Sequence, residues 1–120
     1  EQKRCFMHID DGVDALLKII ENKDASATHR IFNIGNPKEN ISIRTLAETL
    51  VSLIKTYPKH SEAAGKTKLV DVDADSYYGS GYQDVELRVP AIGRAEKYLG
   101  WQPKVNLETG LKKTLDFYLA

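Results

Sequence analysis

The segment from Ser76 to Pro90 concentrates the residue types that could hold a small anionic molecule. It contains three tyrosines, two glycines and one arginine, Arg88. Glycine lets a backbone approach a ligand closely, tyrosine offers a flat apolar face with a polar tip, and arginine offers a cationic fork. The segment therefore predicts one wall of a pocket for a flat anionic ligand, with an ordinary surface loop as the alternative.

Composition narrows the classes of protein to consider. The 120 residues suffice for one domain, 1–120, and the formal net charge of zero does not favour nucleic acid or an anionic membrane as partners. Apolar runs are too short to span a bilayer. The single cysteine, Cys5, cannot form an internal disulfide, which fits a cytoplasmic location. Scattered histidines lack metal-ligand spacing, so no metal site is expected.

Hydrophobic periodicity predicts the helices that must position these residues. The first helix carries an apolar stripe with helical spacing at Val13, Leu16, Leu17 and Ile20. Ser42 is a good N-cap for the second helix, and Gly100 is a good stop for the third. The predicted bounds are Ile9–Asn22, Ser42 to Pro58, Pro90–Gly100 and Leu107–Leu119.

Short β-rich runs predict two or three strands, at Arg4–Met7, Ile31–Ile34 and Thr67–Val72. Residues 59–66 are expected to form a polar loop. The fold class is therefore a small α/β domain. No Gly-x-Gly-x-x-Gly motif follows a predicted strand, so this chain is not expected to bind a dinucleotide by itself. Because the chain enters a strand and a helix directly after Glu1, without a methionine, we expect a piece of a longer polypeptide.

Three blocks, in this order, resemble the extended short-chain dehydrogenases that act on nucleotide sugars. They are Gln-Lys-Arg-Cys-Phe-Met-His-Ile-Asp-Asp at 2–11, Phe-Asn-Ile-Gly-Asn at 32–36 and Arg-Ala-Glu-Lys-Tyr-Leu-Gly-Trp-Gln-Pro at 94–103. The run Tyr-Tyr-Gly-Ser-Gly-Tyr-Gln-Asp-Val at 77–85, followed by Arg88, is similar to the UDP-glucuronate decarboxylases of the polymyxin-resistance type. Leu87 and Val89 depart from this pattern, in which more polar residues flank the arginine.

The resemblance implies a C-terminal substrate-binding lobe whose Rossmann part is absent. NAD and the catalytic Ser/Thr–Tyr–Lys set would belong to the missing domain, which would be this lobe's partner within one chain. The substrate would be UDP-glucuronic acid, and the product a UDP-4-keto-pentose for modifying lipid A with 4-amino-4-deoxy-L-arabinose. The isolated lobe is expected to be catalytically inactive, with apolar surface that favours homo-oligomers.

The resemblance also implies roles for particular residues. Arg88 matches the position credited with donating a proton after decarboxylation, although a guanidinium is better suited to stabilising the negative charge. Tyr82 matches a contact to the UDP moiety, and Gln2, Lys3 and Arg4 match the block that faces uridine and diphosphate. Adjacent side chains on an extended segment point to opposite sides. Only one of the two cations is thus expected to face phosphates, and Arg4 is the better candidate because it can bind two oxygens.

Simpler interpretations remain open for each of these residues. Arg88 could pair with Glu86 or Asp84 on the surface, Tyr82 could pack against Pro90, and the cations near Glu1 could form a solvated terminus. Other residues are given structural roles: Trp101 as a core or helix-junction anchor, Cys5 as a small packed residue, and Asp10 and Asp11 as charges in the first turn of a helix. For the whole chain, the alternatives are a UDP-xylose-forming decarboxylase, a nucleotide-sugar epimerase, or a non-catalytic nucleotide-sugar or protein-binding module.

Overall fold

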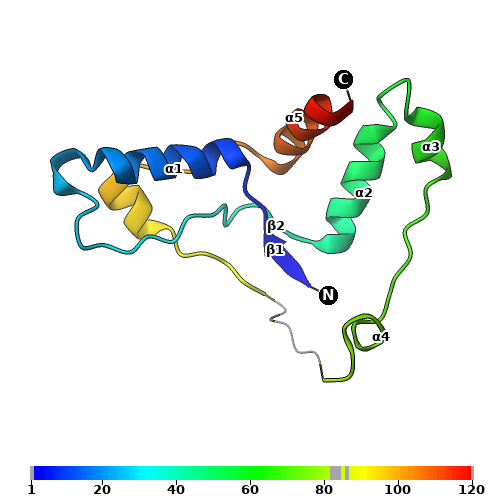
Figure 1. The fold of residues 1–120 in the computed structure, drawn as a ribbon, viewed down its shortest axis with the longest axis horizontal. Helices are drawn as coiled ribbons and strands as arrows, with labels where there is room; N and C mark the ends of the chain where they lie inside the picture. Colours follow the sequence, from blue (N-terminus) through cyan, green and yellow to red (C-terminus); the bar gives the residue numbers. More distant parts are fainter. Residues whose placement is uncertain (1, 82–84, 86, 120) are drawn as a thin grey trace.

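The computed structural model describes residues 2–81, 85 and 87–119 of the chain (Figure 1). The strands are β1 (Lys3–Cys5) and β2 (Asn40–Ser42). The helices and helical turns, in chain order, are α1 (Ile9–Glu21), the 3₁₀ turn η1 (Lys23–Ala25), α2 (Ile43–Ile54), α3 (Ser61–Lys66), α4 (Ala74–Tyr78), the π-helical turn η2 (Ala95–Leu99) and α5 (Leu107–Leu119).

The two strands join segments that lie far apart in the sequence. β1 pairs with β2 in antiparallel orientation, with Lys3 opposite Ser42, Arg4 opposite Ile41 and Cys5 opposite Asn40. Each strand then leads into a helix. His8 caps α1 by accepting the N–H of Asp10 at 3.2 Å. Ser42 caps α2 by accepting the N–H of Thr45 at 3.0 Å, as its residue type predicts.

Trp101 is the centre of the core. Its side chain is fully buried and packs with Ala15 of α1, Ala95 of η2 and Ile92. The indole nitrogen donates to the backbone carbonyl of Asp11 at 2.9 Å. An indole N–H needs such a partner when buried, so the sequence expectation that Trp101 anchors the core is confirmed.

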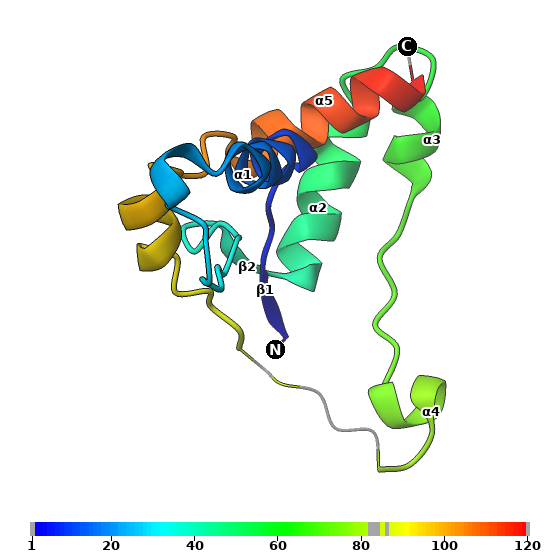
Figure 2. The ribbon, with the colours of Figure 1, turned by 60° about the vertical axis from the view of Figure 1, so that its left-hand side comes forward.

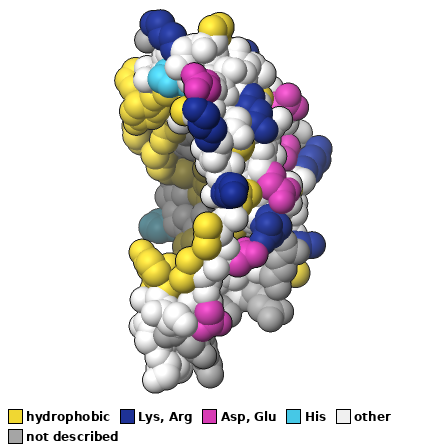
Figure 3. All heavy atoms as spheres, turned by 90° about the vertical axis from the view of Figure 1, so that its right-hand side faces the viewer, with side chains coloured by type: hydrophobic (Ala, Val, Ile, Leu, Met, Phe, Trp, Pro, Cys, Tyr) yellow, Lys and Arg dark blue, Asp and Glu magenta, His cyan; other side chains and the backbone are white. Residues whose placement is uncertain are grey.

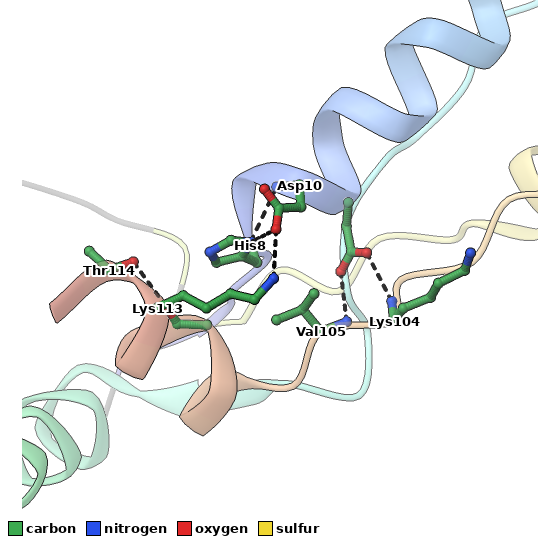
Figure 4. Close-up of polar contacts among 8 residues, drawn as sticks. His8, Asp10, Lys104, Val105, Lys113 and Thr114 are labelled. Carbon is green, nitrogen blue, oxygen red and sulfur yellow. Dashed lines mark hydrogen bonds and ion pairs between the residues drawn. The ribbon is translucent and has the colours of Figure 1, made fainter. Parts of the chain in front are cut away.

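Asp11 also binds the backbone of the segment that follows Trp101. Its carboxylate is 4% exposed and accepts the backbone N–H groups of Lys104 and Val105, both at 3.0 Å. The close-up in Figure 4 shows these two contacts beside the start of α1. Asp11 lies in the first turn of α1, as the sequence predicts. Its carboxylate has a further role that the sequence did not indicate, because it satisfies two backbone donors 93 and 94 residues away.

The first turn of α1 also contacts α5. Lys113 donates to the carboxylate of Asp10 at 2.8 Å, and this hydrogen bond lowers the pKa of Asp10 from its ordinary value. A glycine on α5, Gly110, allows the two helices to approach, because a Cβ at this position would lie 3.1 Å from the Cδ2 atom of His8. Figure 4 shows His8 and Asp10 facing α5.

The chain is flat and open. Its radius of gyration is 17.9 Å and its extents are 54 × 41 × 19 Å, whereas a compact domain of this length has a radius of about 14 Å. Figures 1 and 2 both show the segment after α3 leaving the helices and running to α4 at a distance from them. In both views α5 crosses near the amino end of α1 and beside α2.

Two predicted strands are wrong. Residues 31–34 form no β-ladder with any other described residue. The segment after them lies against Pro90, which has no N–H to donate and whose Cγ would lie 2.8 Å from a Cβ at Gly35. Residues 67–72 are likewise unpaired among the described residues, and Val70 is 79% exposed. The expected loop at 59–66 contains α3, and the third predicted helix is shortened to η2.

The apolar stripe of α1 faces outward. Its four members and Ile9 are between 44% and 77% exposed, and the buried positions of the helix are Asp11 and Ala15. The periodicity located the helix within one residue of its end. It did not identify the face that packs here, because a small alanine and a hydrogen-bonded carboxylate approach Trp101 more closely than leucine would.

Replacing Asp11 should destabilise the fold strongly. Asp11→Ala leaves two backbone N–H groups without their acceptor, and we expect the free energy of unfolding to fall by about 2–4 kcal/mol. Chemical denaturation followed by circular dichroism measures this loss. Asp14→Ala on the same helix is the matched control, since Asp14 only forms an exposed ion pair with Lys18 and should change stability by less than about 0.5 kcal/mol. Equal effects of the two substitutions would contradict the structural role of Asp11.

Two glycine substitutions should differ in their effect. Alanine favours a helix over glycine by about 1 kcal/mol, and at Gly65 in α3 an added Cβ meets no atom within 4 Å. Gly65→Ala should therefore stabilise the chain. At Gly110 the same methyl group presses on His8, so Gly110→Ala should be less stable than Gly65→Ala by about 1–3 kcal/mol. Denaturation midpoints compare the two, and equal stabilisation would show that His8 moves freely away.

Candidate functional site

Two arginines that are far apart in the sequence line one hollow. This open hollow has a volume of about 790 Å³ and lies between β1, the turn at Gly35 and the segment at 87–91. We call it the Arg4–Arg88 hollow. Its remaining described lining comes from Cys5, Phe32, Asn33, Ile34, Gly35, Leu87, Val89, Pro90 and Ala91.

Arg4 enters the hollow from the middle of β1. Its backbone is fixed by pairing with Ile41 of β2. The guanidinium Nη1 donates to the carbonyl oxygen of Lys3 at 2.8 Å and to that of Val85 at 2.9 Å. Arg4 therefore contacts the segment that carries Arg88 as well as lining the hollow.

Arg88 lies on an extended segment beside the other edge of β1. Leu87 forms a parallel bridge with Lys3, and the Cys5 thiol donates to the Arg88 carbonyl oxygen at 3.3 Å. The Arg88 residue is exposed. Burial raises the pKa of the Cys5 thiol above its ordinary value, so the sulfur keeps its proton at neutral pH and can donate this bond.

The charged residues in the described lining of the hollow are all basic. Of the described residues that line it, the charged ones are Arg4 and Arg88. The side-chain amide of Asn33 lies at the same wall and donates to the carbonyl oxygen of Ala91 at 3.4 Å. Arginines that line one concave surface attract anions, and a guanidinium can bind a carboxylate or phosphate through two hydrogen bonds.

A second hollow gathers the tyrosines. It measures about 670 Å³ and is lined by Gln2, by the start of α2 and by the segment from Leu69 to Tyr78. The rings of Tyr77 and Tyr78 pack edge to face with centroids 4.8 Å apart. Figure 3 shows the face that carries α2 and α3, where hydrophobic side chains gather beside a hollow. Arg44 at the rim is paired with Asp71.

The structure does not bring all of the site residues predicted from the sequence together. Arg4 and Arg88 share the first hollow, and Gln2 lines the second. Lys3 lies in β1 between Ser42 and Leu87, outside the described lining of both hollows. Tyr82 lies outside the residues that the structure describes.

Two residues that line these hollows were not predicted as site residues from the sequence. Cys5 was assigned only to packing, and the signal that could have singled it out is its position next to Arg4 on a strand. Arg44 belongs to no recognised motif in the sequence. It lines the second hollow together with Asp71, its ion-pair partner, which lies 27 residues further along the chain.

The described connections between strands and helices lack the glycine-rich turn of a dinucleotide site. A dinucleotide site needs a glycine-rich turn between a strand and a helix, so that backbone N–H groups can hold the pyrophosphate. Here β1 reaches α1 through Phe6, Met7 and His8, and β2 joins α2 directly at Ser42. Within the described part of the chain, no cluster of histidine, cysteine or carboxylate side chains could hold a metal ion. None of the described helices is long and apolar enough to cross a membrane.

Comparison with known proteins fits this geometry. The crystal structure of PbgP3 protein from Burkholderia pseudomallei superimposes with a TM-score of 0.82 at 36% sequence identity, covering 98% of this chain and 31% of PbgP3. The chain thus spans less than a third of the length of that relative. This likeness confirms the expected α/β lobe of an extended short-chain dehydrogenase. Residues 1–114 match the family model for GDP-mannose 4,6 dehydratase, and the chain belongs to that family of nucleotide-sugar enzymes.

Proposed function

We propose that this chain is the substrate-binding lobe of an NAD-dependent UDP-glucuronate oxidative decarboxylase. The product would be a UDP-4-keto-pentose that serves the modification of lipid A in polymyxin resistance. One observation carries the proposal: Arg4 and Arg88, two of the three cations that the sequence motifs single out, line the same hollow. The family membership and the likeness to PbgP3 support it.

The proposed substrate carries negative charge at two places, its diphosphate and its sugar carboxylate. Arg4 would bind the diphosphate, and Arg88 would bind the carboxylate before it leaves as carbon dioxide. Oxidation of the sugar 4-hydroxyl, for which NAD would supply the hydride acceptor, makes the carboxylate β to a ketone. Loss of carbon dioxide from this β-keto acid leaves an enolate, which then takes up a proton at carbon, and a nearby fixed cation stabilises the negative charge of the enolate. We assign Arg88 this electrostatic role, because a guanidinium does not readily release its proton near neutral pH.

The proposal requires a second part of the enzyme to hold NAD. The strand-to-helix connections described above do not provide a pyrophosphate site, so we assign NAD to a Rossmann domain elsewhere in the same polypeptide. The outward stripe of α1 supports such a partner. Leu16, Leu17 and Ile20 are 58%, 52% and 77% exposed, and an apolar face of this kind usually marks an interface.

Replacing Arg88 tests the proposed reaction. In the complete polypeptide whose reading frame contains this sequence, UDP-glucuronate and NAD should yield carbon dioxide, a UDP-4-keto-pentose and NADH. Arg88→Met removes the charge, and we expect kcat to fall by about 10²–10³-fold. Carbon dioxide release and product identification by mass spectrometry and NMR measure the outcome.

Arg94→Met is the matched control, because Arg94 is exposed and is not part of the described lining of the hollow. Its kcat should stay within about twofold of the unaltered enzyme. A UDP-xylose product would assign the chain to the reducing branch of the same chemistry. The absence of UDP-glucuronate turnover by the unaltered enzyme would refute the proposed reaction and favour an epimerase or a binding module.

The isolated 120-residue chain should self-associate through α1. Leu16→Glu combined with Ile20→Glu places two charges on the exposed stripe and should shift the chain to monomer in sedimentation experiments. Ser52→Glu with Gln102→Glu adds the same charge at exposed polar positions and should leave the association unchanged. A single monomeric species of the unaltered chain over a wide concentration range would count against this proposal.

A further inference from the structure

Few apolar contacts hold the segment that carries Arg88. Val85, Leu87 and Val89 are 48%, 54% and 50% exposed, so burial contributes only part of the stabilisation that a packed strand would have. A cation must be held in a defined orientation to bind a substrate productively. Polar contacts must therefore supply much of the order of this segment.

These contacts come from three consecutive residues of β1. Lys3 bridges the backbone at Leu87, the Arg4 guanidinium donates to the Val85 carbonyl oxygen at 2.9 Å, and the Cys5 thiol donates to the Arg88 carbonyl oxygen at 3.3 Å. Arg4 and Cys5 lie 81 and 83 residues from the carbonyl groups that they hold. Since Arg4 and Cys5 are paired with Ile41 and Asn40 of β2, β1 itself is fixed.

We propose that Arg4 and Cys5 are positioning residues that dock the Arg88-bearing segment onto β1, so that a phosphate bound at Arg4 and the guanidinium of Arg88 keep a defined separation. This inference extends the proposed function, on which its kinetic consequence rests. The docking itself is a property of the chain and holds whatever the reaction. Cys5 contributes as a thiol donor to a backbone carbonyl, a bond that serine can replace and valine cannot.

Amide hydrogen exchange tests the docking without any assay of activity. In the complete polypeptide, Cys5→Val keeps an apolar side chain but removes the donor. Exchange at Leu87, Arg88 and Val89 should become about threefold to tenfold faster, the effect of losing one net hydrogen bond. Cys5→Ser should restore protection at these amides, and the amides of α5 should exchange unchanged in both variants.

Steady-state kinetics then tests whether docking of the Arg88-bearing segment affects catalysis. Cys5→Val should lower kcat for UDP-glucuronate about tenfold or less with a smaller change in KM, because Arg88 is misplaced rather than removed, and Cys5→Ser should recover kcat. Arg4→Lys keeps the charge but loses the guanidinium fork, and it should also accelerate exchange at Leu87.

The outcomes separate the two proposals. Unchanged exchange in Cys5→Val, or faster exchange throughout the chain including α5, would overturn the positioning role. If the unaltered enzyme does not turn over UDP-glucuronate, the proposed reaction fails, but local exchange that is faster in Cys5→Val and restored in Cys5→Ser still supports the docking. If exchange responds as expected while kcat does not, the segment is docked by β1 but its docking does not position Arg88 for the reaction.

Discussion

The contact between Asp11 and the chain around Trp101 is the interaction on which the rest of the structure depends. The backbone carbonyl of Asp11 accepts the indole N–H, and its carboxylate accepts two backbone N–H groups just before α5. A buried carboxylate is unfavourable unless its oxygens are satisfied by hydrogen bonds, and here both oxygens are. The same residue thus fixes the start of α1, the indole of the core and the approach of α5.

The packing around Asp11 also restrains the candidate site, because β1 lies only a few residues before Asp11 in the sequence. His8 and Asp10 lie in the same turn as Asp11 and contact α5, and β1 ends only three residues before His8. The position of β1 is therefore determined by α1, which follows its carboxyl end, and by pairing with β2 along its length. Since β1 presents Arg4 to the hollow and carries the segment with Arg88, the geometry of the site follows from the packing of Trp101.

The sequence predicted those parts of the fold that depend on local pattern. The bounds of α1 and α5 were predicted within one residue, because the apolar spacing that defines each helix is a property of residues close together in the sequence. The extended segments 31–34 and 67–72 have β-rich composition, but a strand also needs a partner, and neighbouring residues do not specify one. The outward face of α1 shows the same limit, since periodicity reveals an apolar stripe without identifying what covers it.

For the candidate site, too, the sequence predicted which residues take part but not how they are arranged in space. Motifs singled out Arg4 and Arg88, but their shared hollow depends on a pairing between β1 and Leu87 that no local pattern encodes. This arrangement bears on the choice of ligand. A ligand with two separated anionic groups can pair with both arginines of the hollow. A neutral nucleotide sugar offers only its diphosphate. Under the proposed function, the second arginine therefore favours a uronic acid over a neutral sugar, and it discriminates at the carboxylate that the reaction removes.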